Sequence, residues 1–315
     1  MIEDNTYLHN MEKELVSILI PVYNRVNFVN EAIESALSQT YKNIEIIISD
    51  NCSSDGTWEL LQYYHAKYNQ IRIFRNSENL GPVKNWKRCI DEATGTYSKI
   101  LFSDDLIKDT FVENALKLFD KNTAFVLTGI ESFGDANQFK FFSKKKSYTS
   151  STFLNDVLLY DTVRFPVSPG CAIFRTNDLQ HAILVDIPNE YNLNYAALGG
   201  GNDILLFLIT ATKYPYVKVL NSTESFFRSH PASATILEDT KTLSLYYRYA
   251  KYYFIRNYMP RILPEFYTRE KIRYLLIKEG PIVGKNLNIS FNIPFAFHLI
   301  LINFIAFLKK SLYNR

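Results

Sequence analysis

The sequence has 315 residues, of which 47% are hydrophobic and 21% charged, and its formal net charge at pH 7 is +3. This apolar fraction excludes disorder as the main state, and a chain of this length can bury a core without disulfides or a structural metal. Three widely separated cysteines argue against a disulfide-rich secreted framework and against a structural zinc site. The N-terminus has no basic segment followed by an apolar one, so we expect no signal peptide and a cytoplasmic protein.

Positive charge is concentrated at the C-terminal end. Residues 241–315 carry 13 Lys and Arg but three Asp and Glu, whereas the first 240 residues carry an excess of acidic side chains. A basic C-terminal quarter indicates an anionic partner, such as a membrane surface, a phosphorylated lipid or a nucleic acid, and a solvated helical face is equally compatible. Nucleic acid is disfavoured because the preceding residues are acidic and no nucleic-acid-binding motif is present.

The first 130 residues alternate between strand-like and helix-like patterns. Strands are expected at Val16–Ile20, Ile44–Ile48, Ile71–Phe74, Tyr97–Phe102 and Ala124–Thr128. Helices are expected at Asn30–Thr40, Asp55–Tyr68, Pro82–Ala93 and Thr110–Phe119. This alternation predicts an α/β fold with a mostly parallel sheet flanked by helices, in which ligands bind at the carboxyl ends of the strands.

The second half is harder to interpret. Residues 131–200 show no clear periodicity, Asn202–Ala211 predicts a helix, and Val217–Leu220 and Ser225–Arg228 predict strands. The final 75 residues are expected to be mainly helical. The apolar run Ile293–Leu308 is short for a membrane span, which needs about 20 apolar residues. With the lysines that follow it, this run predicts a helix lying in an anionic membrane interface, or one packed on the protein or on a second subunit.

Two adjacent carboxylates follow the fourth predicted strand, in Ser103-Asp104-Asp105. Carboxylates at the end of a strand can hold Mg²⁺ or Mn²⁺ together with substrate phosphates, and such a metal would neutralise a diphosphate leaving group. The alternative is that Asp104 or Asp105 caps the next helix.

Polar residues also follow the first two strands. Asp50 ends the second strand, where a carboxylate can accept hydrogen bonds from a nucleotide base or ribose. After the first strand, Tyr23 offers a stacking surface and Arg25 a fork for phosphate. The run from Asp50 to Thr57 is rich in turn formers, so Asp55 and Gly56 are equally compatible with turn and cap chemistry.

Together these segments resemble family 2 glycosyltransferases of the GT-A (Rossmann-like) fold. The resemblance rests on VSILIPVYNR, IEIIISDNCSSDGT, ENLGP followed by CIDEATGTY, and ILFSDD, in this order and at βα spacing, and it covers roughly residues 14–235. It implies a GT-A domain over 1–235, with a nucleotide-sugar half at about 14–130 and an acceptor half at about 131–235. A helical, basic C-terminal region then spans 236–315 with an apolar tail at 293–308.

The resemblance also implies roles for individual residues of the donor site. The residues that would line the nucleotide pocket are Pro21, Tyr23, Arg25 and Asp50. Asp104 would contact the ribose or the sugar, and Asp105 would hold Mn²⁺ or Mg²⁺ on the diphosphate. The family's Ala-Arg-Asn triplet is replaced here by Asn85-Trp86-Lys87, so its arginine is missing, and Lys84, Lys87 or Arg88 would supply the charge instead.

Two later segments extend the resemblance. Gly200-Gly201-Asn202-Asp203 resembles the acidic motif that opens the acceptor-side helix, which implies that Asp203 is the general base and that the glycines let the substrate come close. The alternative for Asp203 is a helix cap. The segment that contains Arg228 and His230 resembles a family motif in which the arginine grips the diphosphate and the histidine binds the metal or the diphosphate. A structural histidine is the alternative for His230.

The expected function is that of an inverting, metal-dependent hexosyl- or deoxyhexosyltransferase. The donor would be a nucleoside-diphosphate sugar, and the acceptor a hydroxyl of a glycan linked to a lipid pyrophosphate. This reaction would serve O-antigen, capsule or other surface polysaccharide assembly, with the C-terminal region in peripheral contact with the inner face of the plasma membrane. The aromatic C-terminal region is also a candidate homodimer surface. Alternatives are a sugar nucleotidyltransferase, disfavoured because the loop PVYNRVNF has no glycine, and a non-catalytic glycosyltransferase-like binding protein.

Overall fold

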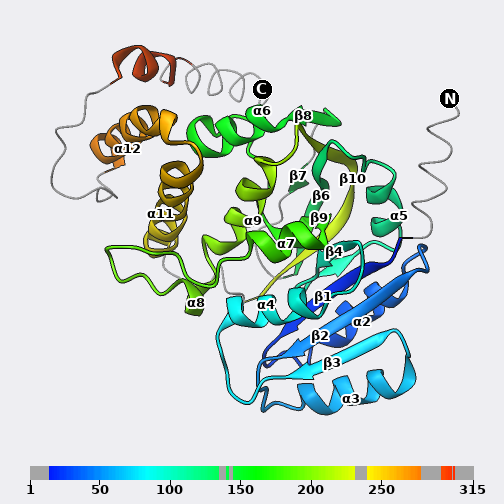
Figure 1. Ribbon diagram of the computed structural model, residues 1–315. Helices are drawn as coiled ribbons and strands as arrows, with labels where there is room; N and C mark the ends of the chain where they lie inside the picture. The colour runs from blue at the N-terminus through cyan, green and yellow to red at the C-terminus, as the bar shows by residue number, and fades with distance from the viewer. Residues whose placement is uncertain are drawn as a thin grey trace, which may run out of the picture.

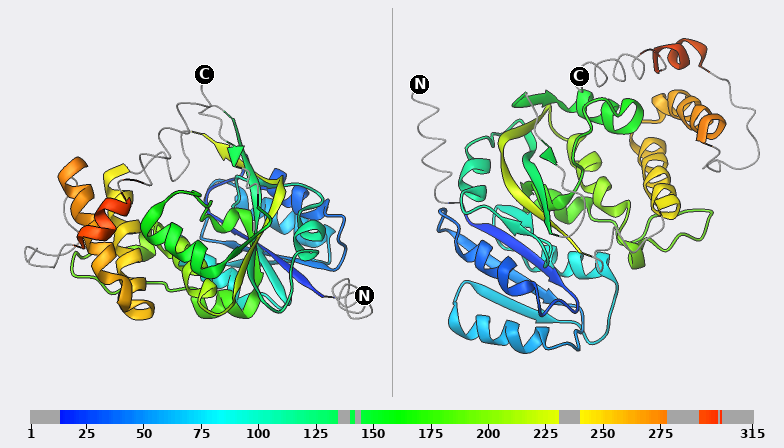
Figure 2. Two further views of the ribbon diagram at one scale, coloured as in Figure 1. Left: turned by 90° about the horizontal axis from the view of Figure 1, so that it is seen from above. Right: turned by 180° about the vertical axis from the view of Figure 1, so that it is seen from behind.

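The computed structural model describes residues 14–134, 140–141, 145–230, 240–277, 292–299 and 301. Its centre is a mixed ten-stranded sheet with the order β3-β2-β1-β4-β9-β6-β10-β5, to which β7 adds beside β6 and β8 beside β10. Helices cover both faces of this sheet (Figures 1 and 2).

The N-terminal half follows the predicted βα alternation. Its strands are β1 (Val16–Val22), β2 (Ile44–Asp50), β3 (Ile71–Arg75) and β4 (Tyr97–Ile100), and neighbouring strands are parallel. Between them lie α2 (Val29–Leu37), α3 (Thr57–Lys67) and α4 (Pro82–Glu92). Strands β1 and β2 are buried along their whole length, as expected for parallel strands covered on both faces, so the predicted α/β organisation is confirmed here.

The sheet becomes mixed in its second half. Strand β9 (Ala172–Arg175) lies between β4 and β6 (Thr123–Gly134) and is antiparallel to both. The two strands predicted within 217–228 are one long strand, β10 (Tyr216–Ser229), which runs parallel to β6 with three register irregularities. The short β5 (Leu106–Ile107) pairs antiparallel with β10.

The stretch that was hard to interpret contains several short elements. They are β7 (Lys140–Phe141), β8 (Ser147–Thr149), α6 (Ser150–Asn155), η1 (Asp156–Tyr160), η2 (Pro169–Cys171), α7 (Thr176–Ala182) and α8 (Tyr195–Leu198). They are preceded by α5 (Phe111–Leu116) and followed by α9 (Asn202–Ala211). Helix α9 is buried on almost every side, which explains why its sequence is apolar without a polar face.

Two apolar cores lie on opposite faces of the sheet. Along β1, Ile18 and Ile20 belong to the core formed with α2, α3 and α5, whereas Leu19 belongs to the core formed with α4, α7 and α9. This alternation follows from the two-residue period of a strand.

The C-terminal region adds α11 (Thr240–Tyr258), η3 (Pro260–Ile262) and α12 (Leu263–Ile277) on the α9 side (Figure 2). Ala250, Phe254 and Ile255 of α11 and Phe266 of α12 join the same core as α9. The helical character predicted for this region is therefore confirmed over these segments. The predicted domain boundary at 235 lies outside the described residues and stays a prediction.

The apolar run predicted at 293–308 is described only over 293–299 and at 301, where the chain is helical. One face packs on the protein, because Phe295 and Leu299 are buried and Phe295 contacts the ring of Tyr160. The other face exposes 58% of Ile293 and 71% of Phe297. Within the described parts of the chain, no helix is long and apolar enough to cross a membrane.

Candidate active site

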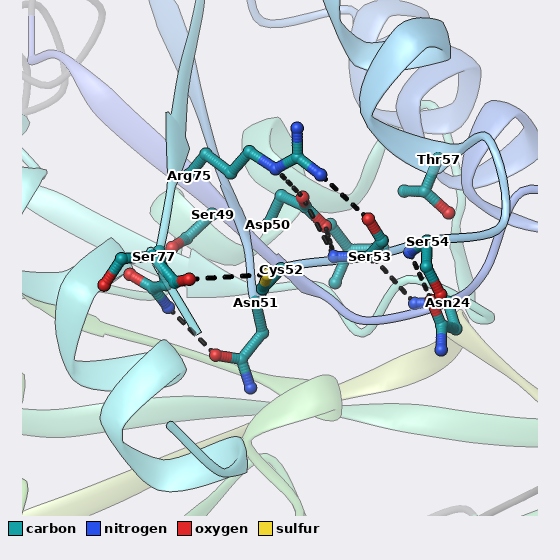
Figure 3. Close-up of polar contacts among 12 residues, drawn as sticks. Asn24, Ser49, Asp50, Asn51, Cys52, Ser53, Ser54, Thr57, Arg75 and Ser77 are labelled. Atoms are coloured by element: carbon teal, nitrogen blue, oxygen red, sulfur yellow. Dashed lines mark hydrogen bonds and ion pairs between the residues drawn. The ribbon is translucent and has the colours of Figure 1, made fainter. Parts of the chain in front are cut away.

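Asp50 lies buried at the carboxyl end of β2. Both of its carboxylate oxygens accept hydrogen bonds from the Ser53 N–H at 3.2 Å, and Oδ2 lies 3.3 Å from Nε of Arg75 (Figure 3). Burial raises the pKa of Asp50, while the Ser53 hydrogen bonds and the charge of Arg75 oppose that rise. Arg75 also donates to the Ser53 carbonyl at 2.9 Å and lies over the ring of Trp58, so the carboxylate is held firmly.

The loop after β1 is fastened to the loop after β2. The N–H of Asn24 donates to Oγ of Ser53 at 2.8 Å, and its side-chain oxygen accepts the N–H of Ser54 at 3.0 Å. Asn24 has a φ of 49°, a left-handed conformation that asparagine tolerates better than most residues. Beside it, Tyr23 exposes 41% of its surface, whereas Pro21 is buried within β1. Tyr23 is therefore exposed directly after Val22, the β1 residue that pairs with Asp50 of β2.

Asp55 also belongs to this junction. Its carboxylate accepts the N–H of Thr57 at 3.0 Å and the N–H of Val26 at 3.1 Å. It therefore fixes the start of α3 and the β1 loop together, in agreement with the turn and cap interpretation.

Five of the predicted site residues meet at the turn after β4. Oδ2 of Asp104 lies 3.1 Å from Nε2 of His230 and 3.6 Å from Nε of Arg25. Oδ1 of Asp105 accepts the backbone N–H of Arg228 at 2.9 Å, and the guanidinium of Arg228 donates to the Asp104 carbonyl at 2.9 Å. Two chain segments distant in sequence, the loop after β1 and the end of β10, thus converge on the two aspartates. The helix-cap alternative for them is wrong, because the next element is β5 and helix α5 begins only at Phe111.

The surroundings of Asp105 disfavour the charged form of its carboxylate. Burial, and then the charge of Asp104, raise the pKa of Asp105 well above its usual range. The N–H of Arg228 and the positive charges of Lys99 and Arg228 act in the opposite direction.

Glu31 and Lys99 are parts of this site that the sequence did not reveal. Glu31 of α2 binds the guanidinium of Arg228 at 2.8 Å, and this guanidinium lies between the rings of Phe28 and Phe133. Lys99 of β4 is fully buried, donates to the carbonyl of Gly170 and lies over a phenylalanine ring. Burial lowers the pKa of Lys99 to about 7. A lysine inside a buried strand was the one available signal.

Helix α4 carries the three predicted substitutes for the missing arginine. Lys87 pairs with Asp91 at 2.6 Å and Arg88 with Glu92 at 3.1 Å, both within the helix, whereas Lys84 lies exposed in its first turn. Asn85 is buried, and its amide donates to the carbonyls of Ser49 and Val22. Asn85 therefore joins the ends of β1 and β2.

Asp203 lies at the start of α9. Its Oδ1 accepts the N–H groups of Gly201 at 3.0 Å and Ile204 at 2.7 Å, and its Oδ2 accepts a hydrogen bond from the hydroxyl of Tyr247. Burial raises the pKa of Asp203 to about 6, although these hydrogen bonds oppose the rise. The N-cap of α9 is Gly201, so Asp203 is not the cap residue, although its carboxylate binds N–H groups at the helix start.

The glycines before Asp203 allow other segments of the chain to pack closely against them. A Cβ on Gly201 would lie 2.9 Å from the ring of Tyr195 and 3.1 Å from the carbonyl of Tyr246. A Cβ on Gly200 would lie 2.7 Å from the side chain of Leu243. We expected these glycines to let the substrate come close. At both positions it is instead α11 and its neighbours that pack closely against the glycine.

Trp86 connects the two parts of the site. A Cβ on Gly199 would lie 3.0 Å from the Trp86 ring, and the ring centroids of Trp86 and Phe102 are 5.6 Å apart. Phe102 directly precedes the Ser103–Asp105 turn, and Gly199 precedes Asp203 by four positions. The segment before the aspartate pair and the segment before Asp203 therefore both pack against the Trp86 ring.

Hard oxygen ligands are present for a divalent cation. Among the described residues, no three His, Cys, Asp or Glu side chains form a group that could hold a metal by themselves. Asp104 and Asp105 fit Mg²⁺ or Mn²⁺ in the arrangement in which substrate phosphates complete the coordination shell.

Comparison with known proteins shows that this chain is similar in sequence to glycosyltransferases of one family. The family described as Glycosyl transferase family 2 matches residues 17–181. The UDP-Glc:alpha-D-GlcNAc-diphosphoundecaprenol beta-1,3-glucosyltransferase WfaP of Escherichia coli is 32% identical over 224 residues, which cover 70% of this chain and 80% of WfaP. The glycosyltransferase GlyG of Streptococcus pneumoniae is 32% identical over 37% of this chain.

Coverage of several relatives is partial. The chain spans 38% of GlyG, 58% of an uncharacterised Haemophilus influenzae glycosyltransferase and 47% of the putative teichuronic acid biosynthesis glycosyltransferase TuaG of Bacillus subtilis. Among solved structures, S. aureus TarS 1–349 in complex with UDP-GlcNAc has a TM-score of 0.64 at 18% identity, covering 90% of this chain and 79% of that one. This likeness confirms the predicted GT-A fold.

Proposed function

Because the chain belongs to glycosyltransferase family 2, we propose that it is an inverting, metal-dependent glycosyltransferase acting on a nucleoside-diphosphate sugar. The observation that carries this proposal is the convergence of Arg25, Asp104, Asp105, Arg228 and His230 at one sheet edge. Asp203 completes the set, and the segment before it packs against Trp86, as does the segment before the aspartate pair. Together these residues provide what a glycosyl-donor site with a neighbouring general base requires.

The donor would lie across the ends of β1, β2 and β4. Asp50 at the end of β2 and Tyr23, which directly follows the strand that contains Pro21, would contact the nucleoside. Lys84, exposed at the start of α4, is the candidate for the charge that the family's arginine would supply. These assignments follow the rule that ligands of parallel sheets bind at the carboxyl ends of the strands.

The diphosphate would lie beside the aspartate pair. Asp105, with His230, would hold Mn²⁺ or Mg²⁺, which when bound neutralises charge on the leaving diphosphate. Asp104 would contact the ribose or the sugar. Arg228 would contact the diphosphate, and its bonds to Glu31 and to the Asp104 carbonyl fix its position before the donor arrives.

The transfer is a single displacement. The acceptor hydroxyl oxygen bonds to the anomeric carbon as the bond from that carbon to the diphosphate oxygen breaks. The nucleoside diphosphate leaves with the bonding electron pair, and Asp203 takes the hydroxyl proton. A carboxylate with a pKa of about 6 is ionised at neutral pH and is a stronger base than an ordinary aspartate.

We further propose a hexosyl or deoxyhexosyl donor and a lipid-pyrophosphate-linked glycan acceptor, in O-antigen, capsule or related surface polysaccharide assembly. Support comes from the names of WfaP and TuaG, which refer to a diphosphoundecaprenol acceptor and to teichuronic acid biosynthesis. The basic C-terminal quarter and the exposed apolar face of 293–299 support peripheral contact with the inner face of the plasma membrane. The same aromatic region is the candidate homodimer surface.

A thermal-shift series tests the donor site. UDP, GDP, dTDP and CMP are each added with and without Mn²⁺ to the wild type, to Asp105→Asn and to Asp109→Asn, an exposed neighbour that serves as the matched control. In the wild type and in Asp109→Asn, we expect one nucleotide to raise Tm when Mn²⁺ is present and not when it is absent. In Asp105→Asn, we expect no shift in Tm under either condition. Folded wild-type protein without any shift would refute the donor site and favour a non-catalytic binding protein. Release of pyrophosphate from a sugar phosphate and a nucleoside triphosphate would identify a nucleotidyltransferase instead.

A further inference from the structure

Helix α11 lies outside residues 17–181, which match the family, yet it contacts the proposed base. The Tyr247 hydroxyl donates to Oδ2 of Asp203, while Oδ1 is occupied by two backbone N–H groups. Each carboxylate oxygen can accept two hydrogen bonds, so Oδ2 keeps one acceptor position beyond the one used by Tyr247.

The position of Tyr247 is determined by its neighbours on α11. The hydroxyl of Tyr195 donates to the carbonyl of Tyr246 at 2.9 Å, and the N–H of Asn194 donates to the hydroxyl of Tyr246 at 3.1 Å. Gly201 meets the same helix closely, because its Cβ would lie 3.1 Å from Ala250. The loop that carries Asp203 and the helix that carries Tyr247 therefore form one fixed unit.

Tyr247 and Asp203 act on each other's titration. The Tyr247 hydrogen bond opposes the burial that raises the pKa of Asp203, and the charge of Asp203 adds to the burial that raises the pKa of Tyr247. On the elements packed beside this pair, the ring of Tyr195 meets that of Tyr246, and the charges of Tyr249, Tyr246 and Asp186 act on Tyr195. Burial raises the pKa of Tyr247 well above its usual range, so the phenol stays protonated and acts as a donor.

We propose that Tyr247 is a positioning residue of the transfer reaction, whose hydroxyl orients the Asp203 carboxylate and leaves the second acceptor position of Oδ2 to the sugar acceptor. This inference rests on the proposed function. In the transfer step the acceptor proton moves to Asp203, and Tyr247 keeps its own proton throughout. The C-terminal helical region thereby completes the active site, independently of any contact with a membrane.

The first test measures the carboxylate directly and needs no substrate. Full-length protein labelled with ¹³C-carboxyl aspartate is titrated by NMR, and the Asp203 signal is assigned by its absence in Asp203→Asn. We expect a midpoint near 6 in the wild type and a rise of about one pH unit in Tyr247→Phe, because a donor to the charged form is lost. Tyr258→Phe is the matched control, since it removes an exposed hydroxyl on the same helix and keeps the ring that stacks on Phe254, and the Asp203 midpoint should not move in it. An unchanged midpoint in folded Tyr247→Phe would overturn the proposal.

The second test measures the role in transfer. The probes are UDP-glucose and a GlcNAc-diphospholipid, the pair in the name of WfaP. For Tyr247→Phe we expect kcat about tenfold lower, an unchanged KM for the donor, and an acidic limb of the pH profile shifted upward with the NMR midpoint. A shifted midpoint with unchanged kcat would refute the positioning role. If the wild type transfers nothing with this pair, that result bears on the proposed function, and the NMR titration still decides whether Tyr247 holds the carboxylate.

Discussion

Replacing the buried Lys99 with methionine should change how stability depends on pH. Burial lowers the pKa of Lys99 from 10.5 to about 7, while the charges of Cys171 and Asp105 oppose this shift. Between these two values the unfolded chain binds a proton that the folded chain does not. The free energy of unfolding of the wild type must therefore rise with pH across this window. The contribution of Lys99 to stability is lowest below about pH 7.

The magnitude follows from the size of the shift. Each pH unit in the window changes the free energy of unfolding by about 1.4 kcal/mol, so the interval between about pH 7.5 and pH 9.5 corresponds to roughly 2.5 kcal/mol. Urea denaturation gives the free energies of unfolding of the wild type and of Lys99→Met at several pH values. The change with pH in the difference between these two free energies measures the effect of Lys99. Subtracting the variant cancels the contributions of those titrating groups that do not interact with Lys99.

Lys108→Met provides the matched control, because Lys108 is an exposed lysine a few residues further on. The stability difference between this variant and the wild type should stay flat over the same interval, since an exposed lysine keeps a similar environment in both states. A flat difference for Lys99→Met as well would show that Lys99 is charged in the fold, and the reasoning about its burial would be refuted.

Three further changes have defined outcomes. Glu45→Gln should lower the free energy of unfolding by about 1–3 kcal/mol in urea denaturation, and an unchanged urea midpoint at pH 7 would contradict this. Burial raises the pKa of Glu45, but hydrogen bonds from Ser17 and Thr94 outweigh burial and leave the pKa lowered. The stabilisation by the Glu45 carboxylate therefore disappears as the pH falls. Gly201→Ala should lower stability by about 2 kcal/mol in thermal unfolding, because φ is +96° and the new Cβ would lie 2.9 Å from Tyr195; full wild-type stability would mean that α11 can move aside. Asp203→Asn should reduce transfer by about 10²–10⁴-fold while the metal-dependent nucleotide shift persists, and an active variant would exclude Asp203 as the base.

The sequence was informative where local pattern and topology act together. Buried strands alternating with helices predicted the N-terminal half of the sheet, and the strand-end rule drew attention to Asp50, Asp104 and Asp105. Arg228 and His230 came from a motif, and the structure brings both to the aspartate pair.

Other features depend on contacts between distant segments, which periodicity does not encode. Nothing local indicates that β9 enters between β4 and β6, because an antiparallel strand of four residues has no pattern that names its neighbours. Tyr247 lies in a helix rich in tyrosines, and only packing distinguishes it from the others. Gly201 signalled a need for space, but the sequence did not show that helix α11 would occupy it.

The interlocked loops after β1 and β2 have a consequence for the thermodynamics of ligand recognition. Asn24, Ser53 and Asp55 hold these loops to each other through hydrogen bonds within the chain. Preorganised recognition elements lose little conformational entropy on association. Calorimetry of nucleotide binding should therefore show no large entropic penalty from loop ordering, and substitutions in this junction should weaken binding mainly by disordering the unliganded protein.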